Sequence, residues 1–170
     1  MENEELYYKD IYDALSRLEI PYSRVCHEHA DTMEACLAIE EELGAKICKN
    51  LFLCNRQQTD FYLLLMPGEK PFKTKFLSAQ LGCSRLSFAD AEHMAQYLNT
   101  TPGSVSALEL IYDKENRVRL IIDRDLFEDE SVGAHPGKNT STVKLLLSDL
   151  LRYCSEAGHE ATVITLPVEE

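Results

Sequence analysis

The chain has 170 residues, of which 45% are hydrophobic and 27% charged, and its formal net charge at pH 7 is −12. This length and composition predict a single domain over residues 1–170 with one hydrophobic core. No stretch approaches the length of a membrane span, and the first residues lack the order of a secretory signal, so we expect a cytoplasmic protein with no membrane partner.

The first third of the chain predicts a helix, a strand and a second helix. Apolar residues recur at helical spacing over residues 3–18, and Pro21 closes that segment. Residues 22–29 are typical of a strand. A second helix is expected from a cap at Asp31 or Thr32 to Leu43, with Gly44 ending it.

The middle of the chain predicts a hairpin followed by two short helices. Residues 49–55 and 60–67 are two β-prone runs joined by a polar turn. Helices are expected over 73–81 and 89–98, the second beginning after Ser87 or Asp90. The following residues, NTTPGSVSA, cannot form a regular element.

The last third predicts a second hairpin, a final strand and a closing helix. Residues 107–127 contain two β-prone runs around the turn DKEN. Residues 140–146 can form the final strand, Ser148 can cap a helix, and Gly158 can end it. Intermixed helices and hairpins without a glycine-rich phosphate loop predict a mixed α/β sheet rather than a dinucleotide-binding fold.

Three polar or irregular segments interrupt this apolar scaffold, at 46–50, 101–106 and 133–142. The third, GAHPGKNTST, concentrates glycines, a histidine, an amide and hydroxyl groups, which permit close approach of the backbone to a ligand. If the sheet brings the three segments together, they form a cleft. Lys49 could then supply a positive charge, Asn50 could orient a carbonyl or an amine, and the glycine turn could present backbone N–H groups. Each residue also has an ordinary structural explanation: a solvated lysine, a surface turn and a structural loop histidine.

The cysteines and histidines do not indicate a metal or redox site. The six cysteines are scattered without paired spacing, which is typical of a reduced compartment and disfavours a redox protein. His27 and His29 would share one face of a strand, but no third ligand lies near them in sequence. No cofactor is expected. Because neither a Ser-His-Asp set nor a cysteine with an evident base is present, a covalent mechanism is poorly supported.

Several motifs in this order, KNLFL, KTKFLSAQLGCSRLSFADAE, TPGSVSALEL and GAHPGKNTST, then DLLRY and GHE, resemble the YbaK/prolyl-tRNA-synthetase-associated editing domain family. The likeness is to its free-standing, alanine-specific, PrdX-like branch, and it runs from about Leu6 to Leu166. The resemblance implies a compact α/β domain around a curved, barrel-like sheet surrounded by helices, without a metal. It implies a trans-editing deacylase that hydrolyses alanine wrongly attached to the proline tRNA.

The same resemblance implies the site residues. The catalytic set is Lys49, Asn50, Gly103, Ser104 and His135. The substrate-binding set is Thr32, Pro102, Gly133, Pro136, Asn139 and Thr142. Two departures, Gly137 and the segment HEHADT, affect the edge of the pocket rather than this signature.

The implied partner is the acceptor end of the proline tRNA, with prolyl-tRNA synthetase as a further candidate. Lys46, Lys73, Lys75 and Lys138 are the candidate tRNA-binding residues, since the acidic net charge leaves only a local basic surface. Two alternatives stay open: a deacylase for Cys-, Ser- or Thr-charged tRNA, and a non-catalytic tRNA-binding module. The residues that line the pocket would decide the first.

Overall fold

The computed structural model describes residues 9–27, 33–101, 104–136 and 140–167. Its elements in chain order are α2 (Lys9–Arg17), β1 (Ser23–Cys26), α3 (Met33–Leu43), β2 (Lys49–Cys54), β3 (Phe61–Met66), α4 (Thr74–Leu81), β4 (Ser87–Phe88), α5 (Ala91–Leu98), the 3-10 helix η1 (Ala107–Tyr112), β5 (Val118–Asp123), the 3-10 helix η2 (Arg124–Glu128), β6 (Ser131–Ala134), β7 (Ser141–Leu146), α6 (Leu147–Glu156) and β8 (Thr162–Ile164). Within these ranges, no helix combines the length and apolar character that crossing a membrane requires.

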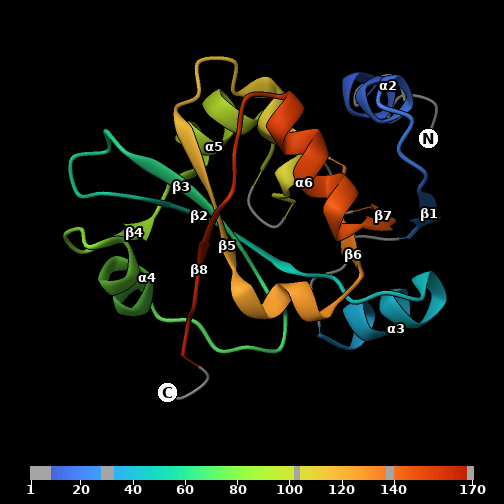
Figure 1. Cartoon of the computed structure of the whole chain (residues 1–170), viewed down its shortest axis with the longest axis horizontal. Helices are drawn as coiled ribbons and strands as arrows, with labels where there is room; N and C mark the ends of the chain where they lie inside the picture. The colour runs from blue at the N-terminus through green and yellow to red at the C-terminus, as the bar shows by residue number, and fades with distance from the viewer. Residues whose placement is uncertain (1–8, 28–32, 102–103, 137–139, 168–170) are drawn as a thin grey trace.

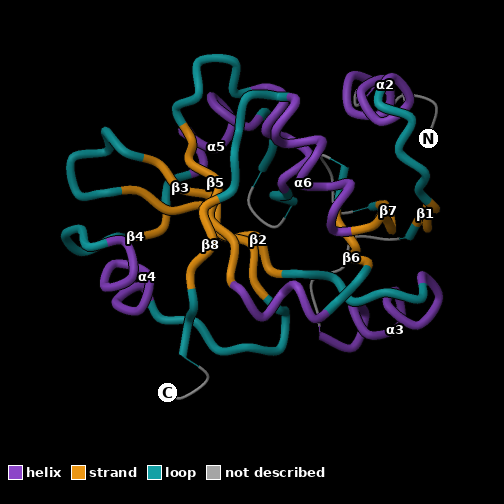
Figure 2. Tube along the Cα trace, in the orientation of Figure 1, coloured by secondary structure: helices purple, strands orange, loops and turns teal. Residues whose placement is uncertain are grey.

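The larger sheet has five strands in the order β4-β2-β3-β5-β8 (Figures 1 and 2). β2 and β3 form the antiparallel hairpin that the sequence predicts, with Lys49 opposite Met66 and Cys54 opposite Phe61. β5 lies parallel to β3, and β8 lies parallel to β5. The sheet is therefore mixed, as the sequence predicts.

Both faces of the central strands β2, β3 and β5 are buried, because alternate side chains of these strands enter different cores. Phe52, Leu63 and Ile122 belong to the main core, which also contains residues of α2, α5, η1 and α6. Leu53 and Leu64 belong to a second core on the other face, covered by Leu77 of α4. Because the pattern alternates, neighbouring residues of β2 serve different sides of the sheet.

The smaller sheet has three antiparallel strands in the order β1-β7-β6. Its β1 and β7 contact α3, and Figure 1 shows α2 and α3 on this side of the molecule. One parallel bridge, between Ile47 and Gly133, and a 2.8 Å hydrogen bond from Gly133 N–H to the Lys46 carbonyl join it to the segment before β2. In the described part of the chain the two sheets adjoin but do not close, so the expected barrel-like sheet is not observed.

The N-terminal and middle elements follow the prediction closely. α3 ends at Leu43, and Gly44 adopts a left-handed φ of 76°, as expected of a helix-ending glycine. Asp90 caps α5 by accepting a hydrogen bond from the His93 N–H.

The predicted second hairpin is wrong. Its first run forms η1 rather than a strand, because Ser106 and Glu109 make a capping box that starts a helical turn. Its second run, β5, pairs with β3 instead. The predicted cap at Ser148 is also wrong, since α6 begins at Leu147 with Leu146 at the cap position. Three short strands, β4, β6 and β8, were not predicted.

Candidate active site

A pocket of about 360 Å³ opens where β2, the start of α5, the segment before η1 and the end of β6 meet. It is lined by Cys48, Asn50, Leu51, Phe52, Phe88, Ala89, Met94, Val105 and His135. All three polar segments singled out in the sequence contribute to this lining. The predicted cleft is therefore present, and its lining is mainly apolar with three polar side chains.

Asn50 is held rigidly at the pocket by backbone groups on two sides. Its Nδ2 donates to the Cys48 carbonyl at 3.1 Å, and its Oδ1 accepts the Ala107 N–H at 3.1 Å. Cys48, just before β2, and Ala107, the first residue of η1, thus fix the orientation of this amide. A preset amide can bind a carbonyl or an amine without reorganising.

His135 enters the pocket from the residue after β6, and its ring is oriented by β7. Its Nδ1 lies 3.1 Å from the Ser141 carbonyl and 3.1 Å from Thr142 Oγ1. A carbonyl only accepts, so Nδ1 carries the proton, and in the neutral ring Nε2 is the acceptor. Thr142, which is fully buried, also contacts His27 Nε2 at 2.8 Å. The centroids of the two imidazole rings are 6.2 Å apart.

The backbone of His135 is held from the side of η1. The Ser106 hydroxyl lies 2.6 Å from the His135 carbonyl oxygen and also contacts the carboxyl group of Glu109. Ser106 and Glu109 are both 0% exposed. The first turn of η1 therefore contacts two polar residues of the pocket, Asn50 and His135.

Lys49 lies on the other face of β2 from Asn50. It pairs with Met66 of the second core, whereas Asn50 pairs with Leu65 of the main core. Its ammonium donates to the Lys70 carbonyl at 2.5 Å, and burial lowers the pKa of Lys49. The structure therefore does not place Lys49 with Asn50 and His135 in the lining of the pocket.

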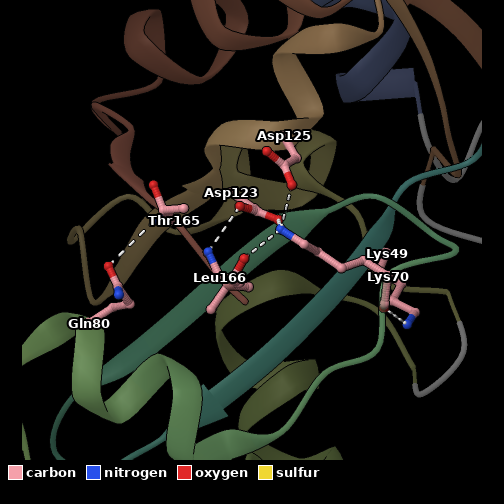
Figure 3. Close-up of polar contacts among 7 residues, drawn as sticks. All are labelled: Lys49, Lys70, Gln80, Asp123, Asp125, Thr165 and Leu166. Carbon is pink, nitrogen blue, oxygen red and sulfur yellow. Dashed lines mark hydrogen bonds and ion pairs between the residues drawn. The ribbon is translucent and has the colours of Figure 1, made fainter. Parts of the chain in front are cut away.

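Lys70, whose carbonyl accepts the hydrogen bond from Lys49, is itself the centre of an ionic cluster in which its ammonium and Asp123 are buried (Figure 3). Its ammonium lies 2.7 Å from Asp123 Oδ2, 2.8 Å from Asp125 Oδ2 and 2.7 Å from the Leu166 carbonyl. Asp123 Oδ1 also accepts the Leu166 N–H at 3.2 Å. The cluster ties the loop after β3 to the end of β5 and to the segment after β8.

Cys48 lines the pocket but is not set up as a nucleophile. Burial raises the pKa of its thiol to about 11, so it stays protonated near neutral pH. Its Sγ lies 4.0 Å from the Gly133 carbonyl. The expectation that no covalent cysteine mechanism operates is consistent with this environment.

Three other predicted site residues have packing or turn contacts. Gly133 is buried, and a Cβ atom there would lie 3.0 Å from Leu43 Cδ2 and 3.2 Å from Thr142 Cγ2. Pro136 is buried beside His135 in sequence and does not line the pocket. The Ser104 N–H donates to the Thr101 carbonyl at 3.0 Å, so in this conformation it is not available to an oxyanion.

The remaining predicted site residues, Thr32, Pro102, Gly103, Lys138 and Asn139, lie outside the described residues.

The predicted tRNA-binding lysines that the structure describes differ in their surroundings. Lys46 pairs with Glu69 at 2.8 Å on the surface. Lys73 and Lys75 are exposed and lie 6.0 Å and 5.6 Å from the centroid of the Phe76 ring. Phe88, which is 58% exposed, lines the pocket near this group, and its ring centroid is 6.1 Å from that of Phe72.

No described group of three or more His, Cys, Asp or Glu side chains is arranged to hold a metal ion. The sequence interpretation missed the contacts of His27, Ser106 and Glu109, and the pocket walls formed by Met94 and Phe88. Only the Ser106-x-x-Glu109 spacing carried a signal, that of a capping box.

The comparisons with known proteins concern nearly the whole chain. Residues 27–153 match the family model described as the aminoacyl-tRNA editing domain. The chain is 30% identical over 152 residues to the prolyl-tRNA editing protein ProX of Acetoanaerobium sticklandii, covering 89% of this chain and 93% of that protein. It is 28% identical to the prolyl-tRNA synthetase associated domain-containing protein 1 of Danio rerio, covering 92% and 86%.

A solved structure described as "a putative trans-editing enzyme for prolyl tRNA synthetase" has the same fold. It superposes with a TM-score of 0.70 at 16% identity, covering 94% of this chain and 97% of that one.

Proposed function

Because the chain belongs to the aminoacyl-tRNA editing domain family, we propose that it hydrolyses the ester bond of mischarged aminoacyl-tRNA, with alanine attached to the proline tRNA as its substrate. The observation that carries this proposal is the meeting of Asn50 and His135 in one mainly apolar pocket. Relatives named as prolyl-tRNA editing proteins support the choice of tRNA.

The pocket lining supports a small apolar amino acid. Phe52, Met94 and Val105 offer no hydroxyl-binding group to a seryl or threonyl side chain. A synthetase pocket built for proline cannot strongly reject alanine, since missing methylenes are worth only about 1–3 kcal/mol, so a second site must remove the error. Cysteine, which is also small and weakly polar, is the competing substrate that this lining tolerates best.

The reaction is a direct hydrolysis. The oxygen of a water molecule attacks the ester carbonyl carbon, and His135 Nε2 orients that water by accepting its hydrogen bond. The carbon–oxygen bond to the terminal ribose breaks, the ribose oxygen takes the proton, and free alanine and a tRNA hydroxyl are the products. Asn50 holds the amino acid by its carbonyl or amino group. The adjacent ribose hydroxyl of the tRNA is the alternative group that could position the water.

The RNA would reach the pocket over Lys73 and Lys75, with Lys46 and Lys138 as further phosphate contacts. The exposed Phe88 ring offers a surface on which an unpaired base can stack. For Lys49 we propose a contact with the terminal adenosine phosphate. Its ammonium would have to exchange its hydrogen bond to the Lys70 carbonyl for that phosphate.

The test is a deacylation assay with alanyl-, prolyl- and cysteinyl-tRNA of the proline acceptor, using the wild type and His135→Ala. We expect loss of the alanyl ester alone, and a rate reduced on the order of 10²-fold or more in the variant. His93→Ala is the matched control, since this histidine packs against the Phe61 ring and does not line the pocket.

Preferred cleavage of another ester would redirect the specificity while keeping the reaction. Tight binding of the aminoacyl-tRNA without cleavage of any ester would establish the non-catalytic module instead.

A further inference from the structure

We propose that Glu109 is a positioning residue that acts as a neutral carboxylic acid, directing the Ser106 hydroxyl onto the backbone carbonyl of His135. The expected effect on turnover rests on the proposed function. The hydrogen-bond arrangement itself can be measured without any substrate.

Ser106 is connected by hydrogen bonds to Leu108, His135 and Glu109. Ser106 Oγ accepts the Leu108 N–H at 3.2 Å, lies 2.6 Å from the His135 carbonyl oxygen and contacts Glu109 Oε2. The other carboxyl oxygen, Glu109 Oε1, accepts the Ser106 N–H at 3.0 Å. The hydroxyl therefore stands between a carbonyl and a carboxyl group.

A count of hydrogens determines which form of Glu109 fits. The hydroxyl of Ser106 has one hydrogen, and the His135 carbonyl has none to give. An ionised Glu109 would compete with that carbonyl for the single hydrogen, so one of the two close oxygen–oxygen contacts of Ser106 Oγ would contain no hydrogen. With a protonated Glu109, the carboxylic acid donates to Ser106 Oγ and the hydroxyl donates to His135, so every contact has its hydrogen.

The surroundings of Glu109 favour the neutral form. The side chain is fully buried, and burial raises its pKa well above the ordinary value. The titratable groups that α6 brings beside it are Tyr153 and Cys154, both of which stay neutral because burial also raises the pKa of each. They donate to the backbone of η1, Tyr153 to the Leu108 carbonyl at 2.7 Å and Cys154 to the Ala107 carbonyl at 3.7 Å. No ion pair joins Glu109 to a basic side chain among the described residues.

The same turn also fixes the second polar residue of the pocket. Ala107, which follows Ser106, donates its N–H to Asn50 Oδ1. A change in the hydrogen bonds of Ser106 therefore reaches Asn50 and His135 together. This places Glu109 behind the site without contact to the substrate.

Three variants separate the neutral acid from an ionised one. Glu109→Gln keeps the shape, a donor toward Ser106 Oγ and an acceptor for the Ser106 N–H, and we expect its kcat to stay within about twofold of the wild type. Glu109→Met and Ser106→Ala remove the arrangement, and we expect kcat to fall on the order of 10- to 100-fold with KM little changed.

The protonation state is read directly by infrared difference spectroscopy of the wild type against Glu109→Gln. We expect the carbonyl stretch of a protonated carboxylic acid at neutral pH. Asp113→Asn is the matched control. The Asp113 carboxylate accepts hydrogen bonds from Arg117 N–H, Val118 N–H and His159, so no band of a protonated acid is expected there.

Two results would overturn the proposal: a Glu109→Gln enzyme as slow as Glu109→Met, or an infrared difference without the protonated band. If Glu109→Met does not fold, Glu109→Gln and the spectrum still decide. If the wild type cleaves no ester, the proposed function fails, while the spectrum and the ¹⁵N shifts of the His135 ring in Ser106→Ala still test this arrangement.

Discussion

At the residue scale, Lys49 has one observed contact and one proposed contact. In the described conformation its ammonium donates a hydrogen bond to the Lys70 carbonyl, and the proposed tRNA phosphate would have to replace that carbonyl. We expect Lys49→Met to raise KM about 10-fold with a smaller change in kcat, because a hydrogen bond from a charged donor is worth about 1.5–3 kcal/mol. Steady-state deacylation kinetics measure both constants.

Lys114→Met is the control for Lys49, since it also removes one lysine, but this lysine is exposed in the turn between η1 and β5 and is not among the proposed RNA contacts. An unchanged KM with a reduced kcat would show that Lys49 acts in the chemical step. Values equal to the wild type for both constants would remove Lys49 from the site.

The protonation of Glu109 also predicts how stability depends on pH. Because its pKa is raised in the folded protein, the folded state keeps a proton that the unfolded chain releases above the ordinary pKa of a glutamic acid. The free energy of unfolding contributed by this group therefore falls as pH rises through that window. We expect the Tm of Glu109→Gln relative to the wild type to increase from about pH 5 to about pH 8. A constant or decreasing difference would contradict the raised pKa.

Asp113 predicts the opposite sign. Burial opposes its ionisation, but hydrogen bonds from His159 and from the N–H groups of Val118 and Arg117 hold its pKa below the ordinary value. Its stabilising contribution is present above the pKa of the unfolded chain and is lost as pH falls through the lower, folded value. In thermal unfolding, Asp113→Asn should be less stable than the wild type at neutral pH, and the difference should shrink in acid.

At the element scale, Gly133 controls how closely β6 approaches the segment before β2. A Cβ atom there would lie 3.0 Å from Leu43 Cδ2 and 3.2 Å from Ile47 Cγ1. Gly133→Ala should therefore lower the free energy of unfolding by about 1–3 kcal/mol and reduce kcat, because His135 directly follows β6. Denaturant unfolding and deacylation rates measure the two effects.

Gly82→Ala distinguishes packing from backbone strain. Gly82 has a left-handed φ of 65°, and a Cβ there would meet nothing within 4 Å. This variant should cost about 1 kcal/mol of stability and leave kcat unchanged. Equal loss of activity in both variants would mean that Gly133 matters only through global stability.

The elements that could be predicted were those whose signals are local. Strands β2 and β3 form a hairpin because two β-prone runs flank a polar turn, and α5 begins directly after Asp90 because that side chain caps it. Ala107–Tyr112 was misread because Leu110, Ile111 and Tyr112 favour a strand, whereas the capping box starting at Ser106 decided for a 3-10 helix. The second run of the predicted hairpin, β5, pairs in parallel with β3, which is distant in sequence. No local sequence pattern predicts that pairing.

The candidate site, like the fold, could be predicted only in part. The three polar segments do meet, and Asn50 and His135 share the pocket. The sequence could not show that Lys49 is directed to the other face, since this depends on the register of β2 with β3. Glu109 was missed because the Ser106-x-x-Glu109 spacing indicates only a capping box, whereas the burial of Glu109 and the contact of Ser106 with His135 arise from tertiary packing.

At the scale of the whole molecule, Lys70 connects three distant parts of the chain through one ammonium group (Figure 3). Lys70→Met would leave the buried Asp123 carboxylate without its cation. We expect this change to lower the free energy of unfolding by about 3–5 kcal/mol in urea. Lys46→Met removes an exposed ion pair and should change it little, so equal losses would contradict the importance of burial.

The acidic chain also predicts a weak dependence of tRNA binding on salt. With a net charge of −12, only a few lysines can contact phosphates. For each of Lys73→Ala and Lys75→Ala, the slope of log KM against log salt concentration should fall by roughly 0.7–0.9. An unchanged slope in both variants would place the RNA elsewhere on the surface.

The opposite orientations of Lys49 and Asn50 affect how residue roles are transferred between relatives. Shifting a strand by one position exchanges the faces of all its side chains. When sequences only 26–30% identical are aligned, a gap can be misplaced by one residue between Gly44 and Lys49. The alignment would then wrongly assign a lysine to the pocket and an amide to the second core. The site residues of different family members should therefore be matched by the pairing of β2 with β3, and not by sequence alignment alone.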